Sequence, residues 1–135
     1  MKRQILMLAV ASCFAAGQAF ALTADEYKIA KEKIEADHKV DKKACDTMKD
    51  NAKDVCNKQA DGKEKVAKAE LEQQYKPSDA HARKVQEEKV DAAYEVAKEK
   101  CDDQKGDAKD ACQEQAKAGE SKGKADLKAM KTSSK

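Results

Sequence analysis

The chain has 135 residues, of which 40% are charged and only 4% are aromatic. After Ala21 the charges balance, with 26 Lys and Arg against 26 Asp and Glu, and Leu, Ile and Val together number only 11. So few large apolar side chains exclude a large core with a deep ligand pocket. The charge balance also removes the strong positive field that is typical of a nucleic-acid binder.

The first 21 residues have the three-part pattern of a secretory signal peptide. Lys2 and Arg3 precede an apolar stretch over residues 5–16, and small residues at Ala19 and Ala21 fit a signal peptidase. We therefore expect cleavage after Ala21 and a periplasmic mature protein. A membrane anchor is the first alternative, although the apolar segment is short for a full span. Lipidation at Cys13, within a loose lipobox, is the second.

The mature chain begins with a helix-start signal and contains no other segment apolar enough to cross a bilayer. Thr23 and Glu26 form the pattern of a capping box, in which each side chain caps the other residue's amide. No stable membrane insertion is expected once the signal peptide is removed.

An internal duplication with an offset of 56 residues organises the rest of the chain. Aligned without gaps, residues 28–71 and 84–127 share 19 identities in 44 pairs. The match includes two cysteines at equal spacing, Cys45 and Cys56 in the first copy and Cys101 and Cys112 in the second.

Both copies read as helix, because Ala, Lys, Glu and Gln dominate them and opposite charges recur four residues apart. The clear break is Lys76-Pro77-Ser78-Asp79, with Gly106 as a soft spot inside the second helix. Weaker breaks are expected at Asp61-Gly62 and between Gly119 and Gly123. The expected divisions are a signal peptide (1–21), a first helical repeat (22–76), a turn (77–79), a second helical repeat (80–118) and a flexible tail (119–135), disordered apart from a short helix.

The four mature cysteines are expected to form two structural disulfides, since the number is even and the compartment oxidising. On one continuous helix, Cys45 and Cys56 would stand about 16 Å apart along the axis, and a disulfide needs Cα atoms within about 7 Å. The predicted pairing is therefore Cys45–Cys112 with Cys56–Cys101, centred on the turn at Ser78-Asp79. The predicted fold is all-α: an elongated antiparallel helical hairpin, stapled by two disulfides.

Two other pairings stay open, because sequence alone does not fix connectivity. The parallel pairing joins Cys45 to Cys101 and Cys56 to Cys112, and it requires a long extended return of the chain. The local pairing joins Cys45 to Cys56 and Cys101 to Cys112, and it requires the helices to unwind between the cysteines.

The sequence offers no catalytic, cofactor-binding or metal site. Zinc ligands come in short pairs such as Cys-x₂₋₄-Cys, whereas these cysteines are separated by ten residues, and His38 and His81 are expected to be solvated. Thiol redox chemistry needs a Cys-x-x-Cys pair, and mature serines lie only at turn or tail positions. The three tyrosines (Tyr27, Tyr75 and Tyr94) are expected at the seam, where the helices pack against each other. We predict a protein that is not an enzyme.

Over residues 24–131 the composition resembles small exported proteobacterial proteins, and it is similar to the Ala- and Lys-rich helical stalk of TolA-type cell-envelope proteins. This resemblance carries over no functional residue, since neither the inner-membrane anchor nor the folded C-terminal domain of that family is found. The expected disulfide-stapled rod exposes long charged faces, and these suit a non-enzymatic periplasmic spacer or adaptor that docks on an envelope protein or forms a homodimer. The alternative is a hydrophilin-like stress protectant, disordered until dried or crowded.

Overall fold

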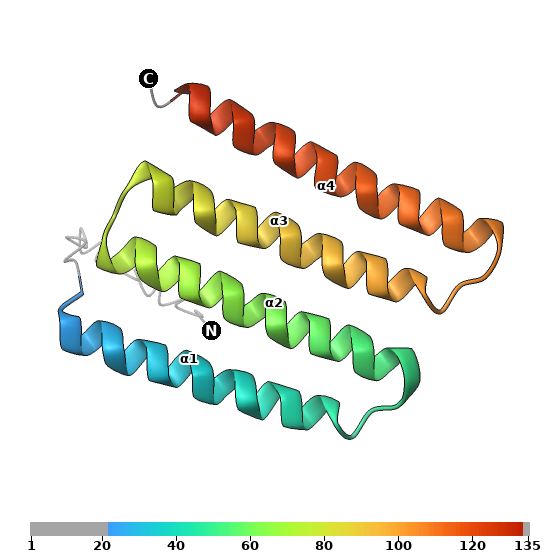
Figure 1. Cartoon of the computed structure of the whole chain (residues 1–135), viewed down its shortest axis with the longest axis horizontal. Helices are drawn as coiled ribbons and strands as arrows, with labels where there is room; N and C mark the ends of the chain where they lie inside the picture. Colours follow the sequence, from blue (N-terminus) through green and yellow to red (C-terminus); the bar gives the residue numbers. More distant parts are fainter. Residues whose placement is uncertain (1–21, 134–135) are drawn as a thin grey trace, which may run out of the picture.

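The computed structural model describes residues 22–133, and the expected signal peptide lies outside them. Four antiparallel helices follow one another: α1 (Ala24–Cys45), α2 (Asp50–Tyr75), α3 (Asp79–Cys101) and α4 (Asp107–Ser133). Within this part of the chain each helix contacts only its neighbours in sequence, so the four lie side by side in one layer (Figure 1). The all-α fold predicted from the sequence is confirmed.

Local signals set two of the helix starts as expected. Thr23 accepts a hydrogen bond from the amide of Glu26, whose carboxylate accepts one from the Thr23 amide, which completes the capping box of α1. Ser78 caps α3 by accepting from the amide of His81 at 3.0 Å. Pro77 lies between α2 and α3, where proline ends the preceding helix.

The predicted pairing of the cysteines is wrong, although all four form disulfides. The bonds are Cys45–Cys56 and Cys101–Cys112, with Cα atoms 5.5 Å and 5.6 Å apart. The helices end at Cys45 and Cys101, so each Cys-x₁₀-Cys segment holds a loop that reverses the chain. Because the chain turns back between the two cysteines, they are not held about 16 Å apart along one continuous helix. Each copy of the duplication is therefore a hairpin closed by its own disulfide.

The two disulfide loops repeat the same construction at the offset of 56 residues. Lys53 pairs with Asp46 at 2.9 Å in the first copy, and Lys109 pairs with Asp102 at 2.8 Å in the second. Asp50 and Gly106 occupy equivalent positions and have positive φ values of 50° and 56°. The soft spot expected at Gly106 is thus the left-handed residue of a turn.

Asp50 adopts this left-handed backbone with a side chain, which glycine does without steric cost. We expect Asp50→Gly to stabilise the protein by about 0.5–1 kcal/mol and Gly106→Ala to destabilise it by about 1 kcal/mol. Urea unfolding of the oxidised protein measures both changes. Equal effects of the same sign at the two positions would contradict this reading of the loops.

Two further expectations about helix boundaries are corrected. The helix α2 continues through Asp61-Gly62, and α4 continues from Asp107 to Ser133 across the predicted tail. Packing decides both cases, because glycines at the helix contacts allow close approach: a Cβ on Gly123 would collide with Val90 of α3. The C-terminal segment is ordered by this contact against α3, up to Ser133.

Small side chains make up most of the buried contacts between the helices. Leu71 and Val85 are the only buried residues among the described ones that are larger than cysteine, with 5% and 7% exposure. The other buried residues with side chains are Cys45, Ala60, Ala69, Cys101 and Ala116. Such interfaces bury little apolar area, so the disulfides contribute a large share of the stability.

Candidate interaction surface

The contact between α2 and α3 separates two hollows on opposite faces of the layer. A Cβ placed on Gly62 would lie 2.8 Å from the Cβ of Ala92, so the two helices touch at this point. Gly62 and Ala92 line both hollows, whereas the remaining lining residues differ. Because no second layer covers the helices within residues 22–133, both hollows open to solvent.

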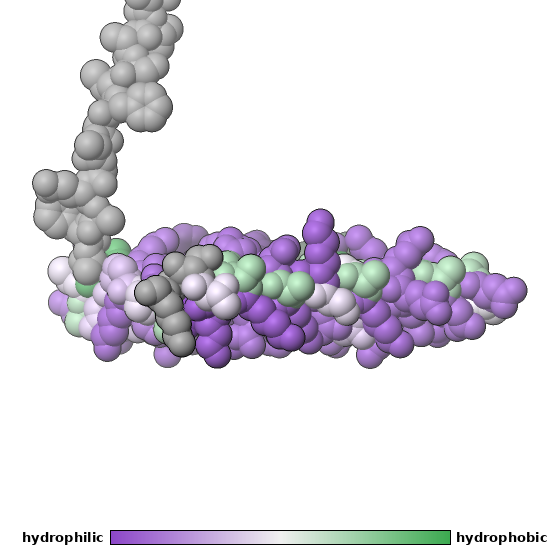
Figure 2. All heavy atoms as spheres, turned by 90° about the horizontal axis from the view of Figure 1, so that it is seen from above, coloured by the Kyte–Doolittle hydropathy of each residue, from purple (hydrophilic) through white to green (hydrophobic). Residues whose placement is uncertain are grey.

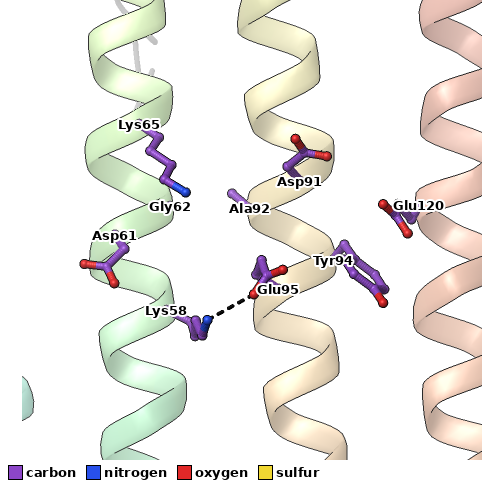
Figure 3. Close-up of a pocket in the computed structure, with 9 residues that line it drawn as sticks. All are labelled: Lys58, Asp61, Gly62, Lys65, Asp91, Ala92, Tyr94, Glu95 and Glu120. Atoms are coloured by element: carbon purple, nitrogen blue, oxygen red, sulfur yellow. Dashed lines mark hydrogen bonds and ion pairs between the residues drawn. The ribbon is translucent and has the colours of Figure 1, made fainter.

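The first hollow is polar and has a volume of about 350 Å³ (Figure 3). Lys58 donates to Glu95 at 3.0 Å across its floor, and this hydrogen bond and the attraction of the ammonium hold the pKa of Glu95 below its ordinary value, despite burial. Tyr94 points toward α4, on the side of Glu120 (Figure 3). The lining contains no serine, cysteine or histidine, and its polar side chains are lysines, carboxylates and Tyr94.

The second hollow, which we call the α2–α3 groove, is largely apolar and has a volume of about 780 Å³. Its floor is formed by valine and alanine side chains, and three lysines lie at its sides. Lys89 pairs with Glu70 at 2.8 Å, and Lys63 pairs with Asp41 of α1 at 2.7 Å. The full lining is Gln59, Gly62, Lys63, Val66, Ala67, Glu70, Lys89, Ala92, Ala93, Val96, Ala97 and Lys100. An open apolar trough between lysines suits an elongated ligand, such as a helix or an extended peptide with acidic flanks.

His38, which was expected to be solvated, instead joins α1 to α2. Its Nε2 lies 2.8 Å from Asp61 and its Nδ1 lies 3.4 Å from Glu64, and its side chain is only 22% exposed. Lys42 contacts Asp61 as well, at 3.3 Å. The amino-acid sequence alone gives little indication of this cluster, since Asp and Glu occur throughout the chain. His81 lies at the α2–α3 turn, with its Nδ1 2.6 Å from the carbonyl of Lys76.

Asp61 makes the stability of the α1–α2 contact depend on pH. Burial raises the pKa of Asp61, but hydrogen bonds from His38 and Lys42 outweigh this and hold the pKa below 3.8, its ordinary value. A carboxyl with a lowered folded pKa stabilises the protein above its unfolded pKa, and this contribution is lost as the pH falls through the folded pKa.

We expect Asp61→Asn to reduce the loss of stability between about pH 4 and pH 2. The expected change is about 0.5 kcal/mol, because Asp61 is 43% exposed and solvent screens the pairs. Urea unfolding at a series of pH values measures it. A pH profile identical to that of the parent protein would contradict the role given to Asp61.

Two of the three tyrosines form a cluster at one end of the α1–α2 contact. The rings of Tyr27 and Tyr75 lie 4.5 Å apart between their centroids. The hydroxyl of Tyr27 donates to Glu72, and this hydrogen bond raises the pKa of Tyr27 above its ordinary value. Tyr94, the third, is half-buried at the α3–α4 contact, so the seam positions predicted for the tyrosines are confirmed.

Neither a metal cluster nor a membrane span is found in the described part of the chain. Among residues 22–133, no three His, Cys, Asp or Glu side chains are placed to hold a metal ion. None of the four helices is long and apolar enough to cross a membrane. A scan against protein-family models finds no match, and searches of curated proteins and of solved structures find none either.

Proposed function

We propose that the protein is a non-enzymatic structural and interaction protein of the cell envelope, exported to the periplasm, where it acts as a spacer or adaptor. The observation that carries this proposal is the single layer of four helices, which exposes two broad faces and holds the apolar α2–α3 groove open on one of them. Such a layer offers a large area for docking relative to the length of the chain.

Several side chains of the kinds that enzymes use are committed to structural contacts here, which supports a binding role. Ser78 caps α3, and all four mature cysteines are in disulfides. The polar hollow is lined by acids and lysines that include the Lys58–Glu95 pair. An enzyme would need an activated nucleophile or a general base positioned in a cleft.

Export is supported by the signal-peptide pattern of residues 1–21 and by the two disulfides, which persist in oxidising compartments. Osmotic release from intact cells, followed by intact mass, tests it. We expect a mass that begins at Leu22 and lacks four hydrogens. A diacylglyceryl mass on Cys13, or retention of residues 1–21, would contradict the soluble periplasmic form.

The docking role of the α2–α3 groove can be tested by photo-crosslinking in the exporting cell. A photoreactive amino acid at Ala93 lies in the groove, whereas one at Lys98 lies about 140° further around α3, toward the other face. We expect one discrete adduct from the Ala93 position and none from Lys98. Equal adducts at both positions, or none at either, would argue against docking in this groove.

The competing stress-protectant function is favoured by the low mean hydropathy of −0.94 and by the 40% of charged residues. Far-ultraviolet circular dichroism of the oxidised protein in dilute buffer separates the two functions. A spacer or adaptor is largely helical in solution, whereas a protectant of this kind becomes helical only on drying or crowding.

A further inference from the structure

The two outer helices leave one side each without a neighbouring helix. On α1, Ile29 and Val40 are both 66% exposed, far more than is usual for such large apolar side chains. They lie eleven residues apart, with Ala36 between them, so the three residues share one side of the helix. Ile29 is nine residues, or two and a half turns, from His38, which contacts α2; this side therefore faces away from α2.

The duplication shows what covers the same side in the second repeat. At the offset of 56 residues, Ile29, Ala36 and Val40 correspond to Val85, Ala92 and Val96 on α3. These α3 residues lie against α2: Val85 is only 7% exposed, and Ala92 touches Gly62. The outer side of α1 is thus the repeat of a side that is covered on α3.

At the opposite edge of the layer, the outer side of α4 is the repeat of the side of α2 that faces α3. The side of α2 that faces α3 carries Val55, Gly62 and Ala69, which follow one another at intervals of seven residues. Their equivalents on α4 are Ala111, Ala118 and Ala125, all of them exposed. Figure 2, which views the layer from the α4 edge, shows hydrophobic side chains in a row along it. We call the side of α4 that carries Ala111, Ala118 and Ala125 the α4 edge. The side of α1 that carries Ile29, Ala36 and Val40 is the α1 edge.

The charges that pair α2 with α3 are also complementary between the two edges. Lys58 pairs with Glu95 at 3.0 Å, and the equivalent residues are Glu114 on α4 and Lys39 on α1. Both charges are exchanged, so the attraction is kept.

The second ion pair between α2 and α3 also has equivalents of opposite charge on the two edges, here with the signs unchanged. Glu70 pairs with Lys89 at 2.8 Å, and the equivalents are Asp126 on α4 and Lys33 on α1. Lys33 now pairs with Asp37 at 2.7 Å and would exchange this exposed partner for Asp126.

We propose that copies of this protein associate edge to edge, with the α4 edge of one copy packed on the α1 edge of the next as α2 packs on α3. The partner is therefore a second copy of this chain. Because the two edges differ, the contact is heterologous and leaves a free edge at each end, which extends the layer into an array. Repeat proteins usually end in helices with polar outer faces, whereas here the outer side of α1 exposes Ile29 and Val40 among its charged residues. The edges are distinct from the α2–α3 groove, so this proposal does not depend on docking there.

One substitution between the repeats makes the edge contact weaker than the internal one. Where α2 has Gly62, α4 has Ala118, and its partner would be Ala36 in place of Ala92. The extra methyl group holds the helices further apart. The association is therefore reversible and depends on concentration, and Ala118→Gly strengthens it.

Sedimentation velocity of the oxidised protein over a hundredfold range of concentration, at low salt, tests the proposal. We expect the average mass to rise with concentration beyond that of a dimer. Ile29→Lys abolishes this rise, because Ile29 corresponds to the buried Val85, whereas the control Met48→Lys, which replaces a 44% exposed residue in the α1–α2 loop, leaves it unchanged. A monomer at every concentration, or an assembly that survives Ile29→Lys, would overturn the proposal.

Two charge-reversal variants distinguish a loss of association from a loss of folding. Lys39→Glu and Glu114→Lys each place like charges at the edge contact, so each variant alone associates less than the parent protein. Mixed in equal amounts, the two variants have opposite charges where the edge of one meets the edge of the other, and association returns. Failure of the mixture to associate, with both variants folded by circular dichroism, would exclude this register of the two edges.

Discussion

Replacing Cys101 and Cys112 together by alanine is expected to detach α4 from the rest of the protein. Within residues 22–133, α4 contacts only α3, across an interface in which Ala116 is the sole buried residue of α4. The disulfide closes a short loop, which is worth about 3 kcal/mol in the chain-entropy model. That is a large fraction of the stability of a small domain.

Hydrogen exchange followed helix by helix measures this effect. In the Cys101→Ala, Cys112→Ala variant, amides of α4 lose protection while those of α1 and α2 keep it, and the melting temperature falls by about 10 °C or more. The matched variant Cys45→Ala, Cys56→Ala exposes α1 instead. A uniform loss of protection along the whole chain in both variants would show that the layer unfolds as one unit.

The disulfide pairing itself is checked by tryptic digestion without reduction. Cleavage after lysine places each cysteine in its own peptide: 44–49, 54–58, 101–105 and 110–117. We expect the linked masses of 44–49 with 54–58 and of 101–105 with 110–117. A linked mass of 44–49 with 110–117 would instead indicate the long-range hairpin.

Much of the secondary structure could be predicted because its signals are local. The capping box at Thr23, the proline at the α2–α3 turn and the helix-forming composition each act within a few residues. The duplication also showed in advance that the chain has two equivalent halves. These signals led to the correct fold class and to the correct position of the central turn.

The disulfide loops could not be predicted in the same way, because the first of them contains neither glycine nor proline. The four residues 46–49 link the helices there, and Asp50 takes the left-handed conformation without the residue that usually marks it. The usable signal lay in the second copy, where Gly106 stands at the position of Asp50. Comparing the two copies position by position would have placed a turn in both and made the local pairing the simplest one.

The contact surfaces depend on the tertiary arrangement, which composition does not encode. The covered side of α3 and the exposed side of α1 carry equivalent apolar residues, so their periodicity does not distinguish one side from the other. His38 illustrates the same limit, since its partners Asp61 and Glu64 come from the next helix. Only the order of the helices in the layer shows which sides meet.

Substituting Gly62 by valine is expected to separate α2 from α3 and to destabilise the protein by about 2 kcal/mol, within the range for overpacking. Any Cβ at this position would lie 2.8 Å from the Cβ of Ala92, and that short side chain has no rotamer to move to. Because neither disulfide crosses this contact, the two hairpins remain closed while the contact between them weakens.

Gly119 provides the matched control, since it lies inside α4 and a Cβ added there would meet no neighbouring helix of the described chain within 4 Å. Gly119→Ala is therefore expected to stabilise the protein by about 0.5–1 kcal/mol through helix propensity alone. Urea unfolding of both variants gives the two free energies, and the hydrogen exchange of α2 and α3 locates the change. If Gly62→Val were as stabilising as Gly119→Ala, α2 and α3 could not lie in contact at Gly62. The edge-to-edge contact between copies is patterned on this α2–α3 contact, so that proposal would lose its basis as well.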